Sequence, residues 1–152
     1  MQIKQIQDAL TALVLDTLPK GAKVLRQDVP EPLPRPCVKI DILPFAVSPA
    51  CAGTREYDID VDIWYYPQDK DRPRDECRQA AELLTDALAD GFDVGGEAWL
   101  QITDDISCDL SNGVLVLQFQ IAWTASVDET GELMETLILD KKEVTDYGSN
   151  NA

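Results

Sequence analysis

The sequence predicts an α+β domain, in which an antiparallel or mostly antiparallel mixed sheet carries two helices on one face. Residues 2–18 and 73–90 repeat apolar side chains at helical spacing. Residues 55–66 and 114–127 instead alternate apolar and polar side chains, as half-buried strands do. Two helices among several such strands pack most simply on the apolar side of one sheet, which leaves the other side polar.

The N-terminal part of the chain begins with the helix at 2–18, which Pro19 ends. A short strand is expected at about 22–27. An extended connection follows, because four prolines that lack the N–H of a sheet ladder stand close together: Pro30, Pro32, Pro34 and Pro36. Residues 37–43 then alternate as a strand, and residues 46–53, which are mostly small and include Pro49, indicate a loop.

The clearest strand spans residues 55–66. Its apolar row and its acidic row point to opposite faces of the sheet, because successive side chains of a strand alternate. The apolar row is Tyr57, Ile59, Val61, Ile63 and Tyr65, and the polar row includes Glu56, Asp58, Asp60 and Asp62. One side of this sheet is therefore expected to be wet and acidic.

The second helix is expected from Pro73, which suits a first helical turn, to about Asp90, with Gly91 as its C-terminal cap. Two long strands, at 98–110 and 114–127, should follow as a hairpin, because Asn112-Gly113 is a strong two-residue turn signal. The core row of the last strand is predicted to be Leu115, Leu117, Phe119, Ile121 and Trp123.

The chain divides into a single α+β domain at 1–128 and a polar C-terminal tail at 129–152. The tail carries one short apolar motif that includes Met134, Leu137 and Leu139. Such a motif needs a surface to pack against, either on its own sheet or on a neighbouring subunit.

The composition excludes several function classes. Thirteen Lys and Arg residues stand against 28 Asp and Glu, with no histidine, for a formal net charge of −15. This charge disfavours a direct grip on nucleic-acid phosphates, and the lack of histidine removes the commonest catalytic base. No apolar run reaches the roughly 20 residues of a membrane span, and the polar N-terminus predicts a cytoplasmic protein without a membrane partner.

The cysteines give no sign of a metal or redox site, because none of the four forms a CxxC pair. Cys77 and Cys108 fall at apolar positions of the predicted helix and strand, where reduced cysteine acts as a small hydrophobe. No glycine-rich phosphate loop is present either. We expect no cofactor and no bound metal.

Two sets of residues remain as candidates for function. The acidic row Asp58, Asp60 and Asp62 would need cross-strand partners to hold a metal, because same-face neighbours on a strand lie about 7 Å apart. The candidates for such additions from other strands are Asp41, Asp105 and Asp109. A solvated acidic face is the simpler interpretation, and such a face would let DNA pass without sticking. Trp64 and Trp99 lie out of phase with the apolar rows of their strands, and they mark either an interface or a covered loop edge.

Several segments of the sequence resemble the small tail terminator, or tail completion, proteins of tailed phages and prophages. They are the N-terminal amphipathic helix, the Arg35-Pro36-Cys37 entry to a strand, the run Asp62-Ile63-Trp64-Tyr65-Tyr66-Pro67, the helix after it, the terminal hairpin and the motif at 134–139.

The resemblance implies a structural virion protein without catalytic residues. Such a protein assembles as a ring, usually a hexamer, on the last ring of the tail tube. There it stops polymerisation of the tube protein and offers a joining surface to the head connector protein. The ring would reside in the tail or neck of the virion after assembly in the host cytoplasm, with Asp58, Asp60 and Asp62 toward its lumen.

Two other classes fit parts of the sequence. An acidic inhibitor that mimics DNA would use the same net charge to occupy the basic site of a nuclease or repressor. A metal-dependent enzyme would use the aspartate row. The clean core pattern and the extra apolar motif in the tail favour an assembling subunit over both.

Overall fold

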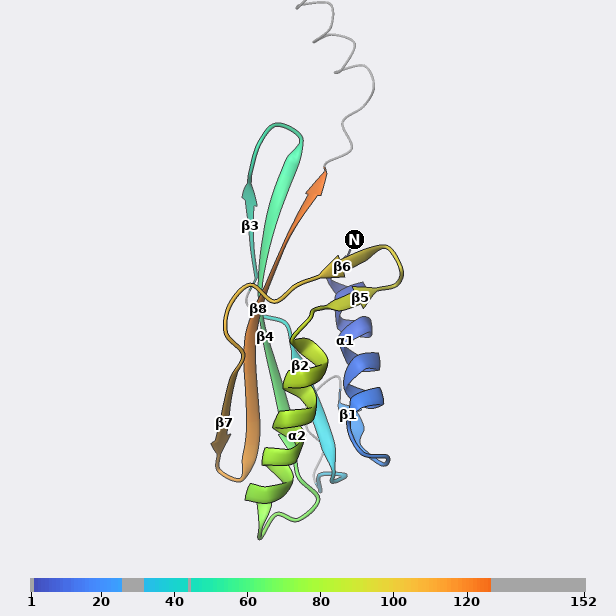
Figure 1. Ribbon diagram of the computed structural model, residues 1–152, viewed down its shortest axis with the longest axis vertical. Coiled ribbons are helices and arrows are strands. Elements are labelled where there is room, and N and C mark those ends of the chain that lie inside the picture. Colours follow the sequence, from blue (N-terminus) through green and yellow to red (C-terminus); the bar gives the residue numbers. More distant parts are fainter. Residues whose placement is uncertain (1, 26–31, 44, 127–152) are drawn as a thin grey trace, which may run out of the picture.

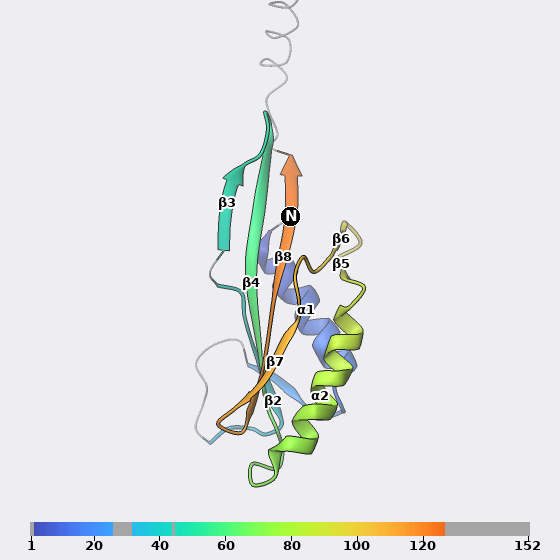
Figure 2. The ribbon, with the colours of Figure 1, turned by 60° about the vertical axis from the view of Figure 1, so that its left-hand side comes forward.

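The structure, a computed structural model, describes residues 2–25, 32–43 and 45–126, and it confirms the expected α+β class. The elements run in the order α1 (Ile3–Thr17), β1 (Lys23–Leu25), β2 (Cys37–Asp41), β3 (Phe45–Pro49), β4 (Thr54–Tyr66), α2 (Pro73–Leu88), β5 (Phe92–Val94), β6 (Ala98–Leu100), β7 (Ser107–Ser111) and β8 (Val114–Ser126). Both helices and the β5–β6 hairpin lie on one side of the main sheet, and no described helix covers its other side (Figures 1 and 2).

Strand β4 is the centre of the main sheet. The sheet has six strands in the order β1-β2-β4-β8-β7, and β3 also pairs with β4. Strand β8 runs antiparallel to β4 along nearly its whole length. On the opposite edge of β4, β2 pairs with residues 62–66 and β3 with residues 55–59, so these two short strands follow one another. Among the described strands of this sheet, β1 is the one that runs parallel to its neighbour, β2.

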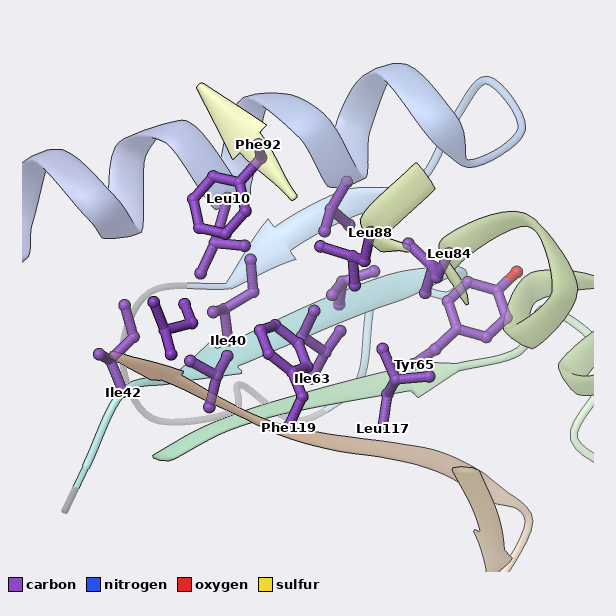
Figure 3. Close-up of a cluster of buried hydrophobic side chains, with 14 of the residues drawn as sticks. Leu10, Ile40, Ile42, Ile63, Tyr65, Leu84, Leu88, Phe92, Leu117 and Phe119 are labelled. Carbon is purple, nitrogen blue, oxygen red and sulfur yellow. The ribbon is translucent and has the colours of Figure 1, made fainter. Parts of the chain in front are cut away.

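The hydrophobic core fills the space between the sheet and the helices. Leu10 of α1 and Leu84 of α2 are fully buried against apolar side chains of β2, β4 and β8 (Figure 3). The alternation expected for β4 is confirmed, since Ile59, Val61 and Ile63 are buried while the aspartates between them are only partly covered. Neither described helix has the length and apolar run that a membrane span requires.

Two of the sequence segments noted above meet at the end of the main sheet that is lower in Figure 1. Cys37 pairs with Tyr66, which brings the start of β2 beside the end of β4. The Arg35 Nη1 donates a hydrogen bond to the Pro67 carbonyl oxygen at 3.0 Å, and its guanidinium lies 6.0 Å from the Tyr66 ring centroid. Arg35 therefore joins the entry to β2 to the exit from β4 through a charge-assisted hydrogen bond and a cation–π contact.

The prediction of a loop at 46–53 is wrong, because β3 occupies its first half. Phe45 and Val47 point to the same face as Ile59 and Tyr57, their partners on β4. The alternation in Phe45-Ala46-Val47-Ser48 is that of a strand, but it is short and is followed by Pro49. Pro49 is tolerated because β3 is an edge strand and needs no N–H toward a further neighbour.

The prediction of one continuous strand at 98–110 is also wrong. The chain makes β6, then a single bridge from Ile102 to Ile121, and then β7. The break contains Asp104 and Asp105, and the Asp105 N–H donates to Oδ1 of Asp104 at 2.8 Å. An aspartate that binds neighbouring backbone in this way competes with a sheet ladder, which explains the interruption.

The turns expected after α2, at Gly91, and between β7 and β8, at Asn112-Gly113, are confirmed. Gly91 follows α2 at a φ of +88°, its N–H donates to the Leu88 carbonyl oxygen, and a Cβ there would lie against the Leu100 carbonyl oxygen. Asn112 and Gly113 both have positive φ, and Ser111 pairs with Val114 across them. This is the geometry that a two-residue hairpin with an Asn-Gly pair adopts.

Tyr65 joins the end of β4 to the first turn of α2, and it makes the stability of the fold depend on pH. Its hydroxyl donates to Oε2 of Glu76 at 3.1 Å. Burial, and secondarily the charge of Glu76, raise the pKa of Tyr65 above its ordinary value. The folded state therefore holds this proton to higher pH than the unfolded state does, so the contribution is complete below about pH 10 and is lost as pH rises through the folded pKa.

We expect the free energy of unfolding to fall above about pH 10, with up to about 1.4 kcal/mol per pH unit arising from this one proton. Tyr65→Phe keeps the ring and should flatten the decline, at a cost of roughly 1 kcal/mol at neutral pH for the lost hydrogen bond. Urea denaturation from neutral to alkaline pH measures both effects. Buried Cys37 and Cys77, whose pKa values burial also raises, leave a residual slope in the variant. Equal slopes in both proteins would contradict this role of Tyr65.

Candidate functional site

The acidic row lies on the sheet face that the helices leave bare. Asp58, Asp60 and Asp62 alternate with buried residues of β4, and each faces a partner on β8: Ala122, Gln120 and Gln118 respectively. The Gln120 Nε2 donates to Oδ1 of Asp60 at 2.8 Å. On the other side of β4, Asp62 is directly opposite Asp41 of β2. The row is therefore part of a wider polar surface rather than an isolated line of carboxylates.

An open hollow gathers more carboxylates beside this row. Asp60 and Asp62 line it together with Asp104 and Asp105 of the loop before β7. Of the three residues considered from sequence as additions to the row, Asp41 and Asp105 lie close to it, while Asp109 of β7 is opposite Val116. Within residues 2–25, 32–43 and 45–126, no group of three or more acidic or cysteine side chains has the arrangement to hold a metal ion.

Trp64 lies on the same bare face, near the lower end of the sheet. It stands in a cross-strand row between Lys39 of β2 and Val116 of β8. The Lys39 ammonium lies 5.3 Å from the Trp64 ring centroid, within the range of a cation–π contact. Trp64 Nε1 is buried and has no hydrogen-bond acceptor among the described residues. The interface role of Trp64 remains a prediction.

Trp99 lies on the helical side of the sheet, in the β5–β6 hairpin. Its Nε1 donates to the Asp90 carbonyl oxygen at 2.9 Å, which ties the hairpin to the end of α2, yet 59% of the residue is exposed. Trp99 therefore has an anchored edge and a free apolar face, which suits a contact with another protein. The structure does not bring Trp64 and Trp99 together, because they lie on opposite sides of the main sheet.

The sheet continues beyond the helices as a three-stranded arm, made of β3, residues 54–58 of β4 and residues 122–126 of β8 (Figure 2). Its face on the helical side carries the row Val47, Tyr57 and Trp123. The Tyr57 and Trp123 rings stack at 4.7 Å between centroids, whereas Phe45 and Val47 are 44% and 45% exposed. The arm therefore presents apolar side chains that the rest of the described chain does not bury.

Sequence reasoning missed Phe45 and Val47 as surface residues, because it assigned their segment to a loop. The alternation of these two side chains with Ala46 and Ser48 was the available signal. The predicted candidates Met134, Leu137 and Leu139 lie outside the described residues.

The four cysteines are free thiols, of which Cys51 and Cys108 are exposed. Cys37 and Cys77 are buried, and burial raises the pKa of both thiols, which disfavours the reactive thiolate. Cys108 is exposed, contrary to the apolar environment expected for it, because β7 is the outermost strand of the sheet. Cys37 and Cys77 therefore serve as core packing, whereas Cys108 is in contact with solvent.

The chain was compared with models of known protein families. A family model described as "Phage tail terminator protein" matches residues 3–132, which is most of the chain. A search among curated proteins finds no match.

Asp62 should destabilise the isolated fold, because like charges directly opposite on paired strands repel by roughly 0.2–1 kcal/mol and Asp41 faces it. We expect Asp62→Asn to raise the free energy of unfolding by about that amount in low salt. The gain should shrink in roughly 1 M salt, where the Debye length is about 3 Å.

Asp58→Asn is the matched control for this measurement, because Asp58 lies on the same strand and face but has Ala46 and Ala122 as its cross-strand partners. Its effect should be much smaller. Chemical denaturation of both variants at two salt concentrations decides the matter. Equal effects of the two substitutions would show that the Asp41–Asp62 pairing is energetically unimportant.

Proposed function

Because the chain belongs to the phage tail terminator family, we propose that it caps the tail tube, stops polymerisation of the tube protein and forms the joining surface to the head connector. Copies of the chain form a closed ring in this proposal, a hexamer if it follows the resemblance noted in the sequence. The ring belongs to the tail or neck of the virion. Its partners are other copies of itself, the tail tube protein and the head connector protein.

The bare acidic face of the sheet is the observation that carries this proposal furthest. A ring at the end of a tail tube must let DNA through, and DNA carries a negative charge on every phosphate. A lumen lined by Asp58, Asp60 and Asp62 repels the passing polymer and does not retain it. The opposite side of the sheet holds the two helices and suits the outside of the ring. This orientation gives both faces of one sheet a use.

The remaining candidate residues serve as contacts between proteins in this proposal. Trp99 is exposed on the β5–β6 hairpin and would contact the tube or the connector. The apolar motif with Met134, Leu137 and Leu139 would dock on a neighbouring subunit. Neither role needs a catalytic group, which agrees with the structural character of the family.

An acidic inhibitor that mimics DNA is the second candidate, and the net charge of −15 favours it. Exposed apolar side chains on the arm argue against it, since a DNA mimic needs charge at its binding surface. Such an inhibitor would bind a basic nuclease with an affinity that falls steeply as salt is added. The two functions therefore differ in partner and in salt dependence.

Added to polymerising tail tube protein, this chain should shorten the tubes and leave a density at one end. It should act at far less than one copy per tube subunit, because only the ends of tubes need to be occupied. Negative-stain imaging measures tube length and end structure, and light scattering gives the mass of the free protein. Unchanged tube lengths and bare ends, together with salt-sensitive binding to a basic nuclease, would favour the inhibitor.

Charge reversal on the bare face should block DNA passage without blocking assembly. We expect particles with Asp58, Asp60 and Asp62 all replaced by Lys to have capped tails but strongly reduced infectivity, because a cationic lumen retains DNA. The control replaces three exposed carboxylates on the helical side, Glu82, Asp86 and Asp90, by Lys, which makes the same change in net charge. Plaque counts that fall equally for both triple variants, or for neither, would contradict the lumenal orientation.

A further inference from the structure

The two edges of the arm are open in the described structure. Strand β3 pairs only with β4, and residues 122–126 of β8 pair only with β4, because β7 and the Ile102 bridge end at Ile121. The arm therefore has one free edge on β3 and another on β8, at opposite sides of the same three strands (Figure 1). A free edge carries a row of backbone N–H and C=O groups that can pair with another strand.

The hydrogen-bond pattern identifies the outward groups on β3. The Ala50 N–H donates to the Thr54 carbonyl oxygen, which makes this pair a hydrogen-bonded one. Because hydrogen-bonded and non-hydrogen-bonded pairs alternate along an antiparallel ladder, Val47 and Phe45 direct their backbone groups away from β4. Pro49 is in the same phase, and its missing N–H ends the outward row on that side.

Strand β8 also has a row of backbone groups that point away from β4. The Thr103 N–H donates to the Gln120 carbonyl oxygen, so the backbone of residue 120 points away from β4. By alternation, Ala122, Thr124 and Ser126 also point outward. The Ala122 N–H belongs to the Ile102–Ile121 bridge, so Thr124 and Ser126 are the residues whose outward groups no described strand receives. Each edge of the arm thus offers at least two residues with unpaired outward groups.

The open edges also lack the charges that usually protect an edge strand. Exposed edges commonly carry a charged side chain that prevents pairing with other chains. The outer strands at the lower end of the sheet follow this rule, with Lys23 on β1 and Asp109 on β7. Residues 45–49 and 121–126 contain no charged residue, although 27% of the chain is charged. Phe45 and Val47 add exposed apolar area beside one edge.

We propose that the occupant of these edges is a second copy of this chain, with β3 of one copy added to residues 122–126 of β8 in the next. Strands β3 and β8 run in the same direction, because each is antiparallel to β4. Copies related by rotation about an axis along the arm therefore present the two edges to each other as a parallel pair. The contact is heterologous, so it repeats from copy to copy and closes when the rotation closes.

This inference rests on the proposed function, in which several copies surround the end of the tube. It adds that a continuous sheet of arms joins the copies, and that the row Ala46, Asp58 and Ala122 of each arm lies on the lumenal face of this sheet. The small alanines at both edges of this row leave room for a neighbouring strand. Backbone pairing of this kind supplies affinity without a preformed side-chain pocket.

Disulfide cross-linking between the two edges tests the pairing directly. In a background with the exposed cysteines replaced, Cys51→Ser and Cys108→Ser, Ala46→Cys is combined with Ala122→Cys, Thr124→Cys or Ser126→Cys. These positions share one face, and the three partners sample the possible registers. Mild oxidation of the purified protein should convert most of one variant into a ladder of covalent oligomers. Ala46→Cys with Gln118→Cys is the control, because Ser107 of β7 already covers that part of β8.

Adding Val47→Pro to the variant that cross-links best should abolish the ladder, because it removes an outward N–H that β4 does not use. A ladder no stronger than the Gln118→Cys control for all three partner positions would overturn the pairing. Tube capping by the parent chain without any ladder would overturn it and leave the proposed cap standing. A ladder without tube capping would support the pairing while contradicting the cap.

Discussion

Strand β4 must bury one row of side chains and keep the next row in water, and the rest of the fold follows from this requirement. Ile59, Val61 and Ile63 need an apolar layer, which α1 and α2 supply, whereas the aspartates between them need solvent. Strands β2, β3 and β8 pair directly with β4, and β1 and β7 join the main sheet through β2 and β8. A one-residue slip of this strand would exchange its two faces, so the pattern also determines the register of the sheet.

The length of β4 then explains the arm. The strand is 13 residues long, as is β8, and the two remain paired past the region that the helices cover. The sheet therefore ends in three strands with helices on neither side. Such an extension is costly for a monomer, because it leaves apolar side chains and strand edges in water. It becomes useful in an assembly, where both are covered.

Regular side-chain patterns accounted for the parts of the fold that the sequence could predict. Both helices, β4, β8 and the Asn112-Gly113 turn follow from periodicity and local turn chemistry, which act over a few residues. Strand β3 was missed because Ala46, Ser48 and Pro49 resemble a loop, and the break before β7 was missed because Asp104 and Asp105 act through a local hydrogen bond. The acidic row was foreseen, but its neighbours Gln120 and Asp41 depend on cross-strand register, which a single strand does not reveal.

In the proposed ring, the bare acidic face of the sheet lines a channel and the helices face outward. Electron cryomicroscopy of tail tubes capped by this protein measures that orientation directly. We expect Asp58, Asp60 and Asp62 to border the channel, with α1 and α2 on the outer surface of the ring. A ring in which the helices border the channel, or in which the acidic face is buried against the tube protein, would contradict the claim.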